Sequence, residues 1–166
     1  MAWGCYTTLD PTVLEGTGGT SDRLPTCSFT DSASSRYIVC AAPLAHAAAS
    51  EDCRLRGAHL AAIQSAEENE FIGAAVFAQV TTNVWIGGSR SDDLVWSWPD
   101  GSVFWRGDSS GSSENGAFAL WQAGEPNDSS TVTTDPERCL VLTIGNIDWN
   151  DRSCSLSLPY VCEQEL

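Results

Sequence analysis

The stretch Cys139-Leu-Val-Leu-Thr-Ile-Gly-Asn-Ile-Asp-Trp-Asn-Asp151 joins an apolar run to an acidic end. Its first six residues have the apolar and β-branched content that predicts a strand. Its last two residues, Asn150 and Asp151, offer side-chain oxygens in sequence that is typical of a loop. Cys139 and Cys154 stand on either side and would pin the ends of that loop. The segment therefore predicts a strand that leads into a fixed loop rich in oxygen ligands.

Three acidic clusters share the second half of the chain. They are Glu125-Pro126-Asn127-Asp128, Glu137, and Asn150-Asp151. Each lies in loop-like sequence and offers the hard oxygen ligands that calcium takes, usually six to eight in number. A proline between two ligands can fix a cis peptide bond and aim both neighbouring side chains at one point. Taken singly, however, each cluster has the composition of a turn. Calcium binding and plain turn formation are therefore both open interpretations.

The cysteines are numerous and widely spaced. Seven occur in 166 residues, without the paired spacing of a zinc ribbon. They are Cys5, Cys27, Cys40, Cys53, Cys139, Cys154 and Cys162. Wide separations favour disulfides, and disulfides indicate an oxidising, extracellular compartment. Because seven is odd, at least one thiol is expected to be unpaired or bonded outside the chain.

The charge balance excludes two classes of partner. A net charge of −14 would repel nucleic acid and anionic membranes. No stretch approaches the roughly 20 apolar residues that a membrane span needs.

The start of the chain, Met1-Ala-Trp-Gly-Cys5, lacks the features of a signal peptide, so we expect a mature or excised domain behind an added methionine. All eight basic residues are arginine, which, with the alanine-rich stretch Ala41–Ala49, hints at a GC-rich bacterial source.

The first part of the chain predicts an arm and then a helix. Residues 1–26 carry turn formers and little periodicity, so we expect a loop-rich arm there and one domain over residues 27–166. An alanine-rich run between Pro43 and Gly57 predicts a helix, because helices often stop at glycine.

A second helix and several strands are predicted to complete the domain. The helix begins with a capping box in which Ser65 and Glu68 satisfy each other's free backbone N–H groups. The predicted strands cover residues 37–40, 84–88, 94–98, 139–144 and 158–162, and residues 60–63 are a short strand or an extended link. An exposed insertion is predicted at residues 106–117 and a long polar loop at residues 124–138. Two helices followed by short antiparallel strands and long loops make an α+β fold.

Four sets of residues together resemble the C-type lectin domain family. They are Trp85-Ile-Gly-Gly88, Glu125-Pro-Asn127, Trp149-Asn-Asp151 and the cysteines Cys53, Cys139, Cys154 and Cys162. The resemblance runs from about residue 27 to residue 163 and implies the looped α+β fold of that family. It also implies the disulfides Cys53–Cys162 and Cys139–Cys154, with Cys27–Cys40 closing an N-terminal hairpin and Cys5 left as the odd thiol.

The resemblance further implies calcium-dependent carbohydrate binding. The calcium ligands that it carries over are Glu125, Asn127, Glu137, Asn150 and Asp151. All of these except Asp151 would also bond two vicinal sugar hydroxyls on the ion. The order Glu-Pro-Asn resembles the mannose-type subclass, which takes equatorial hydroxyls as in mannose, fucose, glucose or N-acetylglucosamine. The expected partner is thus a glycan or polysaccharide.

Two departures from the family pattern concern the long loop and a second ion. Nine residues separate Asn127 from Glu137, so residues 129–135 are expected to add contacts or to shield the site. A second calcium would draw on Asp93, Asp128 and Glu137. A further aspartate of that set is replaced near Arg90, which disfavours the second ion.

Three functions other than sugar binding are catalysis, integrin adhesion and adhesion to another protein or surface. The two histidines, His46 and His59, are better explained as surface or packing residues than as catalysts, and carboxylates committed to calcium cannot carry protons, so no enzyme is expected. Arg106-Gly-Asp108 spells a tripeptide known for integrin adhesion, but tripeptides recur by chance. The stronger rival is a calcium-stabilised protein- or surface-adhesion module, because fold does not fix function. In either case we expect a secreted or extracellular protein.

Overall fold

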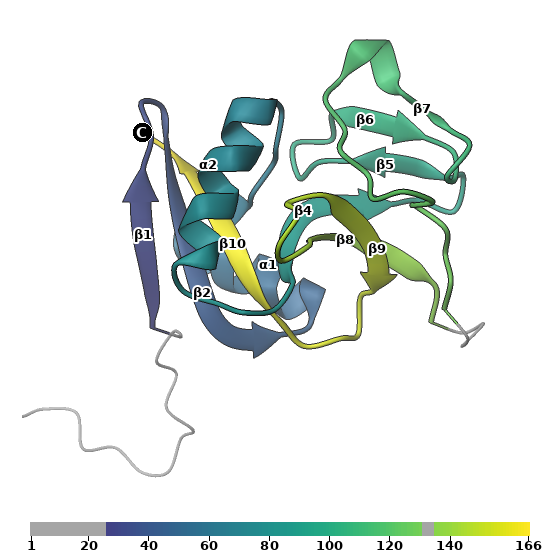
Figure 1. Cartoon of the computed structure of the whole chain (residues 1–166). Coiled ribbons are helices and arrows are strands. Elements are labelled where there is room, and N and C mark those ends of the chain that lie inside the picture. The colour runs from purple at the N-terminus through teal and green to yellow at the C-terminus, as the bar shows by residue number, and fades with distance from the viewer. Residues whose placement is uncertain (1–25, 131–134) are drawn as a thin grey trace, which may run out of the picture.

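The computed structural model describes residues 26–130 and 135–166 of the chain. Residues 1–25 of the predicted arm, including Cys5, and residues 131–134 of the predicted loop lie outside the described residues. The α-helices are α1 (His46–Leu55) and α2 (Ala66–Phe77) (Figure 1). The strands are β1 (Cys27–Asp31), β2 (Ser35–Leu44), β3 (His59–Leu60), β4 (Val84–Arg90), β5 (Val95–Ser97), β6 (Val103–Arg106), β7 (Ser112–Ser113), β8 (Glu137–Leu142), β9 (Trp149–Ser153) and β10 (Leu158–Glu165).

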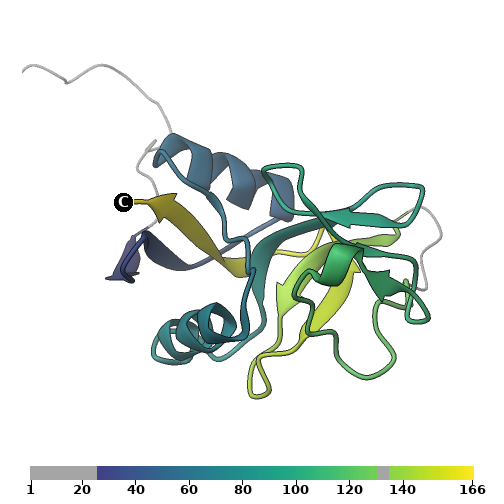
Figure 2. The same cartoon turned by 90° about the horizontal axis from the view of Figure 1, so that it is seen from above.

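The two helices lie on opposite faces of strands β2 and β10 (Figure 2). β10 pairs antiparallel with β2, and β2 pairs antiparallel with β1. The beginning and the end of the described domain are therefore joined by main-chain hydrogen bonds. β10 also pairs in parallel with β4, at Tyr160 and Trp85, which connects this half of the molecule to the strands β4 to β9.

Side chains that alternate along the strands supply two apolar cores, one under each helix. On β8, Leu140 and Leu142 join the core that contains the α2 residues Ile72 and Val76. Their neighbours Cys139 and Val141 point the other way, into the core that contains the α1 residues Ala49 and Cys53. This is the two-residue period of a strand whose two faces are both covered. Such burial on both sides explains why residues 139–142 read as an unbroken apolar run.

The start of α2 confirms half of the predicted capping box. The Ser65 hydroxyl accepts the Glu68 N–H at 3.1 Å. The Glu68 carboxylate, however, accepts the N–H of Gln64 at 2.7 Å and the hydroxyl of Tyr37 at 2.6 Å. The predicted bond from the Ser65 N–H to Glu68 is therefore wrong. The Glu68 carboxylate instead binds the Tyr37 hydroxyl, which β2 places beside it, and the N–H of the residue before Ser65.

The predicted α+β class is confirmed, and three strands were missed. β6 lies where no strand was predicted, and Trp149-Asn-Asp151, predicted as loop, forms the first part of β9. β9 pairs antiparallel with β8. This pairing supplies hydrogen-bond partners for the backbone of β9, and the polar side chains of β9 give no sign of it in the sequence. The insertion predicted at residues 106–117 also contains β7 and a 3₁₀ turn over Glu114–Gly116.

Three disulfides occur among the described residues, and they are the three that the resemblance implied. Cys27–Cys40 joins opposed residues of β1 and β2. Cys53–Cys162 ties α1 to β10 across 109 positions of sequence. Cys139–Cys154 joins β8 to the segment that follows β9, a separation of 15. The last of these fixes the hairpin that carries two of the acidic clusters.

Candidate metal centre

The β8–β9 hairpin and one loop bring the predicted ligands together. The antiparallel register sets Asn150 opposite Val141 and Asp151 opposite Leu140, while Glu137 begins β8. The loop that carries Glu125 is fixed to β9 by main-chain bonds. Gln122 donates its N–H to the Trp149 carbonyl at 2.8 Å. All three acidic clusters of the sequence therefore meet beside this hairpin.

A cis peptide bond shapes the loop between Glu125 and Asn127. The Glu125–Pro126 bond is cis, as the proline between two predicted ligands suggested. Pro126 is buried and Asn127 is exposed. The Asp151 side chain, which has no solvent exposure, accepts the N–H groups of Asn127 at 3.1 Å and Asp128 at 2.8 Å. A strand residue thus holds the backbone of the loop, and the Asn127 side chain faces solvent.

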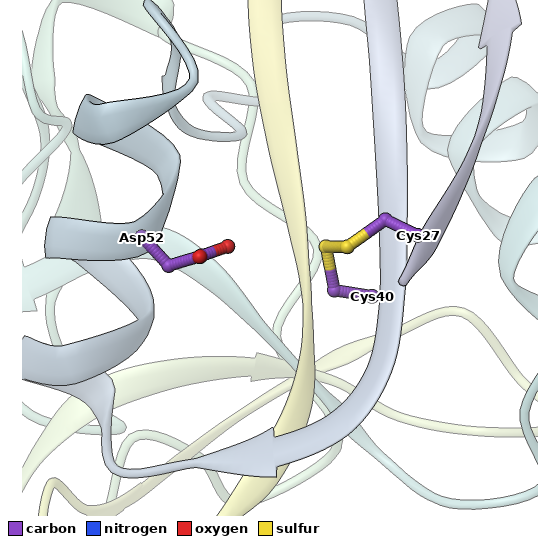
Figure 3. A group of neighbouring side chains, drawn as sticks. All are labelled: Cys27, Cys40 and Asp52. Carbon is purple, nitrogen blue, oxygen red and sulfur yellow. A yellow bond between two sulfur atoms is a disulfide. The ribbon is translucent and has the colours of Figure 1, made fainter. Parts of the chain in front are cut away.

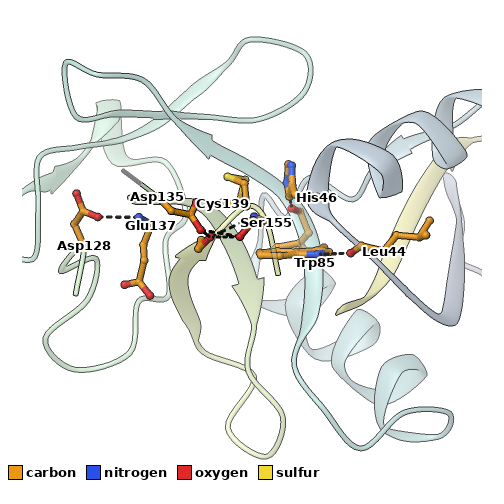
Figure 4. Close-up of a disulfide and its surroundings, with 11 residues drawn as sticks. Leu44, His46, Trp85, Asp128, Asp135, Glu137, Cys139 and Ser155 are labelled. Carbon is orange, nitrogen blue, oxygen red and sulfur yellow. Dashed lines mark hydrogen bonds between the residues drawn. A yellow bond between two sulfur atoms is a disulfide. The ribbon is translucent and has the colours of Figure 1, made fainter. Parts of the chain in front are cut away.

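Glu137 holds the next part of the same loop. Its carboxylate accepts both the N–H of Ser129, at 2.9 Å, and the Ser129 hydroxyl, at 3.1 Å. The Glu137 N–H donates to Asp128 at 2.8 Å, next to the disulfide of Cys139 (Figure 4). Arg152 approaches the second carboxylate oxygen of Glu137 at 3.6 Å. Ser129 belongs to the segment that was expected to add contacts or to shield the site, whereas nothing in the sequence pointed to Arg152.

The Glu125 carboxyl group has a strongly altered acidity. Burial, the adjoining Asp151 carboxylate and the negative charge of Glu137 raise the pKa of Glu125 to about 7. One of its oxygens, Oε2, is buried without a hydrogen-bond partner. Carboxylates that repel one another, with a buried oxygen left unpaired, form a site that a cation would stabilise. The donor set of carboxylates and asparagine side chains fits calcium.

The remaining predicted ligand, Asn150, is buried beside this cluster. Its amide donates to the Gln122 side chain at 3.4 Å. Gln122 comes from the loop that carries Glu125, so the amide of Asn150 is oriented across the gap between loop and hairpin. Printed contacts thus link Glu137 and Asp151 to the loop that carries Glu125 and Asn127, and Asn150 lies next to Asp151 on β9.

The second predicted calcium set is arranged differently. Asp93 is exposed, and both Asp128 oxygens already have partners. One accepts the Glu137 N–H and the other is bonded to the Arg90 guanidinium at 2.7 Å. Burial raises the pKa of Asp128, but the bonds from Arg90 and from the Glu137 N–H outweigh it and hold that pKa below its ordinary value. The position of Arg90 agrees with the sequence argument against a second ion.

Another group of potential ligands lies in the core under α1. Cys27, Cys40 and Asp52 place three such atoms within 4.8 Å of one another, the one set of this kind among the described residues (Figure 3). Both sulfurs belong to a disulfide, and metals bind the thiolate. The Asp52 carboxylate accepts the Tyr160 hydroxyl and pairs with Arg56 at 2.7 Å. This group is therefore structural. The carboxylates around Glu125 lie farther apart, because those of Glu137 and Asp151 are turned toward main-chain N–H groups.

The histidines and a separate hollow lie elsewhere. The His46 ring packs edge-on against Trp85, and burial lowers the pKa of His46. A hollow of about 760 Å³ lies between the β1–β2 turn and the start of α2. Glu68 and Glu163, which line it, already accept hydrogen bonds from neighbouring residues. His59 also lines it, and none of the five predicted ligands does.

The family follows from a direct match over most of the chain. The family model described as Lectin C-type domain matches residues 43–164. The chain belongs to the C-type lectin domain family. This confirms the family predicted from the motifs. Because C-type lectins and lectin-like receptors are not enzymes, it also supports the expectation that this C-type lectin domain is not one.

Curated relatives of this C-type lectin domain come from animals. C-type lectin lectoxin-Lio1 of the snake Erythrolamprus poecilogyrus is 30% identical over 119 residues, which are 68% of this chain and 63% of that protein. Ladderlectin of the trout Oncorhynchus mykiss is 31% identical over 115 residues, 67% of this chain and 52% of that protein. The chain thus spans about half to two thirds of the length of these relatives. They give no support to the bacterial source expected from composition.

A solved structure of similar fold shows that calcium is not universal on this scaffold. A calcium-independent type II antifreeze protein is 27% identical, with a TM-score of 0.64, over 82% of this chain and 91% of that one. In the described residues, no helix is long and apolar enough to cross a membrane.

Proposed function

We propose that this C-type lectin domain binds carbohydrate through one calcium ion. The ion would be held by Glu125, Asn127, Glu137, Asn150 and Asp151. The observation that carries the proposal is the state of Glu125, whose pKa is raised to about 7 by burial and by its carboxylate neighbours, and whose Oε2 is buried and unpaired. A domain that stayed free of metal would have no use for this repulsion, whereas a divalent cation relieves it.

The ligands divide into donors and acceptors that suit a sugar diol. Bound calcium would supply a hard cation that takes two vicinal hydroxyl oxygens into its coordination sphere. The amide groups of Asn127 and Asn150 would donate hydrogen bonds to those hydroxyls, and the carboxylates of Glu125 and Glu137 would accept them. Asn127 is exposed, so a sugar reaches it without any rearrangement of the core.

The order of Glu125 and Asn127 favours equatorial hydroxyls of the mannose type. We infer mannose, fucose, glucose or N-acetylglucosamine as the class of sugar, within a secreted or cell-surface protein. The relatives named as lectins support carbohydrate binding in general. The three disulfides are consistent with an oxidising compartment.

The second candidate function is adhesion to a protein or another surface without sugar. The similarity to a calcium-independent antifreeze protein favours it, because that protein has the fold without needing the ion. The two candidates differ in what they require of a bound ion. Sugar binding needs a calcium ion that takes two sugar hydroxyls into its coordination sphere, whereas adhesion needs calcium at most to stabilise the fold.

The test is titration with calcium followed by a glycan array with and without chelator. We expect a calcium Kd of roughly 10⁻⁴ to 10⁻³ M, as in extracellular modules, and a higher Tm when the ion is bound. Mannose-type glycans should bind with calcium and be lost with chelator. Absence of calcium binding at millimolar concentration would overturn the proposal. Calcium binding without any bound glycan would favour the adhesion function.

The double substitution Glu125→Gln with Asn127→Asp is expected to change the sugar preference. It keeps the total charge of the calcium site but exchanges the positions of hydrogen-bond donor and acceptor around the ion. The ratio of galactose to mannose affinity should rise by about tenfold or more, because a mismatched polar group is poorly tolerated. Competition for an immobilised mannose ligand by free galactose measures this ratio. Unchanged preference would refute the mannose-type assignment while leaving calcium binding intact.

A further inference from the structure

Arg90 is a buried cation at the end of β4. Its side chain is only 8% exposed, and its guanidinium carbon lies 6.0 Å from the centre of the Trp96 ring. One of its nitrogens bonds to Asp128 at 2.7 Å, while its Nε is buried without a partner. Burying an arginine this deeply is costly, so a geometric role is expected of its contacts.

Asp128, the partner of Arg90, stands between two predicted calcium ligands. Its N–H donates to Asp151 at 2.8 Å, and its carboxylate accepts the Glu137 N–H at 2.8 Å. Its φ of 50° lies in the left-handed region, which aspartate adopts more readily than most residues other than glycine. Arg90 holds the remaining carboxylate oxygen. Every polar group of Asp128 named here is thus fixed by a neighbouring element.

We propose that the Arg90–Asp128 pair is the positioning device of the calcium site. It would hold the Asn127–Ser129 segment in its ion-binding conformation before any ion arrives. The pair is neutral, so its main effect on the site is conformational. A loop that spends only a fraction of its time in the competent conformation binds more weakly by that fraction. The inference rests on the proposed calcium site.

A positioning role for Arg90 and a simple charge effect predict opposite changes in calcium affinity for Arg90→Met. If Arg90 acted only as a nearby positive charge, Arg90→Met would tighten calcium binding and Asp128→Asn would weaken it. If the pair acts by positioning, both substitutions weaken calcium binding, because either one releases the loop. In that case the double variant should be no worse than the single ones, which is the signature of two residues acting as a unit.

The experiment is a double-mutant cycle measured by calorimetry on folded proteins. We expect Arg90→Met and Asp128→Asn each to raise the calcium Kd by about tenfold, with no further loss in the double variant. Arg90→Lys, which keeps a donor and a charge, should recover part of the loss. Arg138→Met is the matched control. Arg138 pairs with Asp92 at 2.5 Å and is 40% exposed. Its replacement also removes one positive charge near Asp128, yet the calcium Kd of this variant should stay within about twofold of wild type. Additive losses, or tighter binding by Arg90→Met, would overturn the proposal.

A second readout keeps the inference testable without calcium. In the calcium-free protein, amide exchange of Asp128 and Ser129 should be about tenfold faster in Arg90→Met than in wild type, because their N–H bonds to Asp151 and Glu137 are then held less firmly. Exchange in the β8–β9 ladder should not change. If wild type binds no calcium, the proposed function fails and this comparison alone decides the role of Arg90. Unchanged loop exchange would refute it.

Discussion

Glu125→Gln is expected to weaken calcium binding by about 100-fold and, at the same time, to stabilise the calcium-free domain. The first effect follows from losing one of three carboxylate ligands, since ligand charge sets calcium affinity over orders of magnitude. The second follows from the raised pKa of about 7. At pH 7.5 the ionised Glu125 costs the folded state free energy that glutamine, which cannot ionise, does not.

The stabilisation should be modest but measurable. Allowing for solvent screening, removal of this charge is worth about 1 kcal/mol, which raises Tm by roughly 3 °C in a domain of this size. Calorimetric titration and thermal unfolding in chelator measure the two effects. Glu70→Gln is the matched control, because Glu70 is an exposed residue of α2 and its loss changes net charge equally. A lower Tm in chelator combined with unchanged calcium affinity would mean that Glu125 supports the fold instead of an ion.

Acid is expected to release calcium and sugar together, with most of the loss between about pH 7 and pH 5. In the calcium-free protein Glu125 is protonated below a pKa of about 7, so calcium must displace that proton. Each pH unit below 7 should then lower the apparent calcium affinity by about tenfold, which amounts to roughly 100-fold at pH 5. Retention on a mannose resin across this range, at two calcium concentrations, measures the effect. Binding that persists at pH 4, or a midpoint that does not move with calcium concentration, would contradict it.

The contribution of Glu125 to the stability of the calcium-free domain should decrease as the pH rises, opposite to its effect on calcium affinity. The pKa of Glu125 is raised above its value in the unfolded chain, so the folded state holds the proton more tightly. That contribution to stability is fully present below about pH 4.5 and is lost as the pH rises through 7. In chelator, the Tm of wild type relative to that of Glu125→Gln should therefore be higher at pH 5 than at pH 7.5. The variant should lack this part of the pH dependence.

Sequence patterns predicted the parts of the fold that depend on local chemistry. The apolar run that begins at Cys139 predicted a strand, and the structure shows in addition that its side chains alternate between two cores. Asn150 and Asp151 were misread as loop because their polar side chains concealed a strand whose pairing with β8 is not local. Pairing across a hairpin depends on a partner that composition alone does not identify.

The proposed ligands of the candidate site come from the sequence motifs, whereas the bonds among them required the structure. The motif residues identified Glu125, Asn127, Glu137, Asn150 and Asp151. Ser129 lies in the segment expected to add contacts, but its bonds to Glu137, like the contact of Arg152 with Glu137, depend on how the loop folds back onto β8 and required the structure. Arg90 was noticed only as a departure from the family pattern. Its burial and its bond to Asp128 required the structure.

The last residue of the chain is fastened at the end of the molecule away from the β8–β9 hairpin. Leu166 donates its N–H to the Ser34 carbonyl at 2.9 Å, at the tip of the β1–β2 turn, and both views place this end opposite the hairpin (Figures 1 and 2). The proposed calcium site therefore lies away from this end of the domain. If several such domains were presented together with that site exposed, weak single contacts with neighbouring sugars would add up to firm attachment.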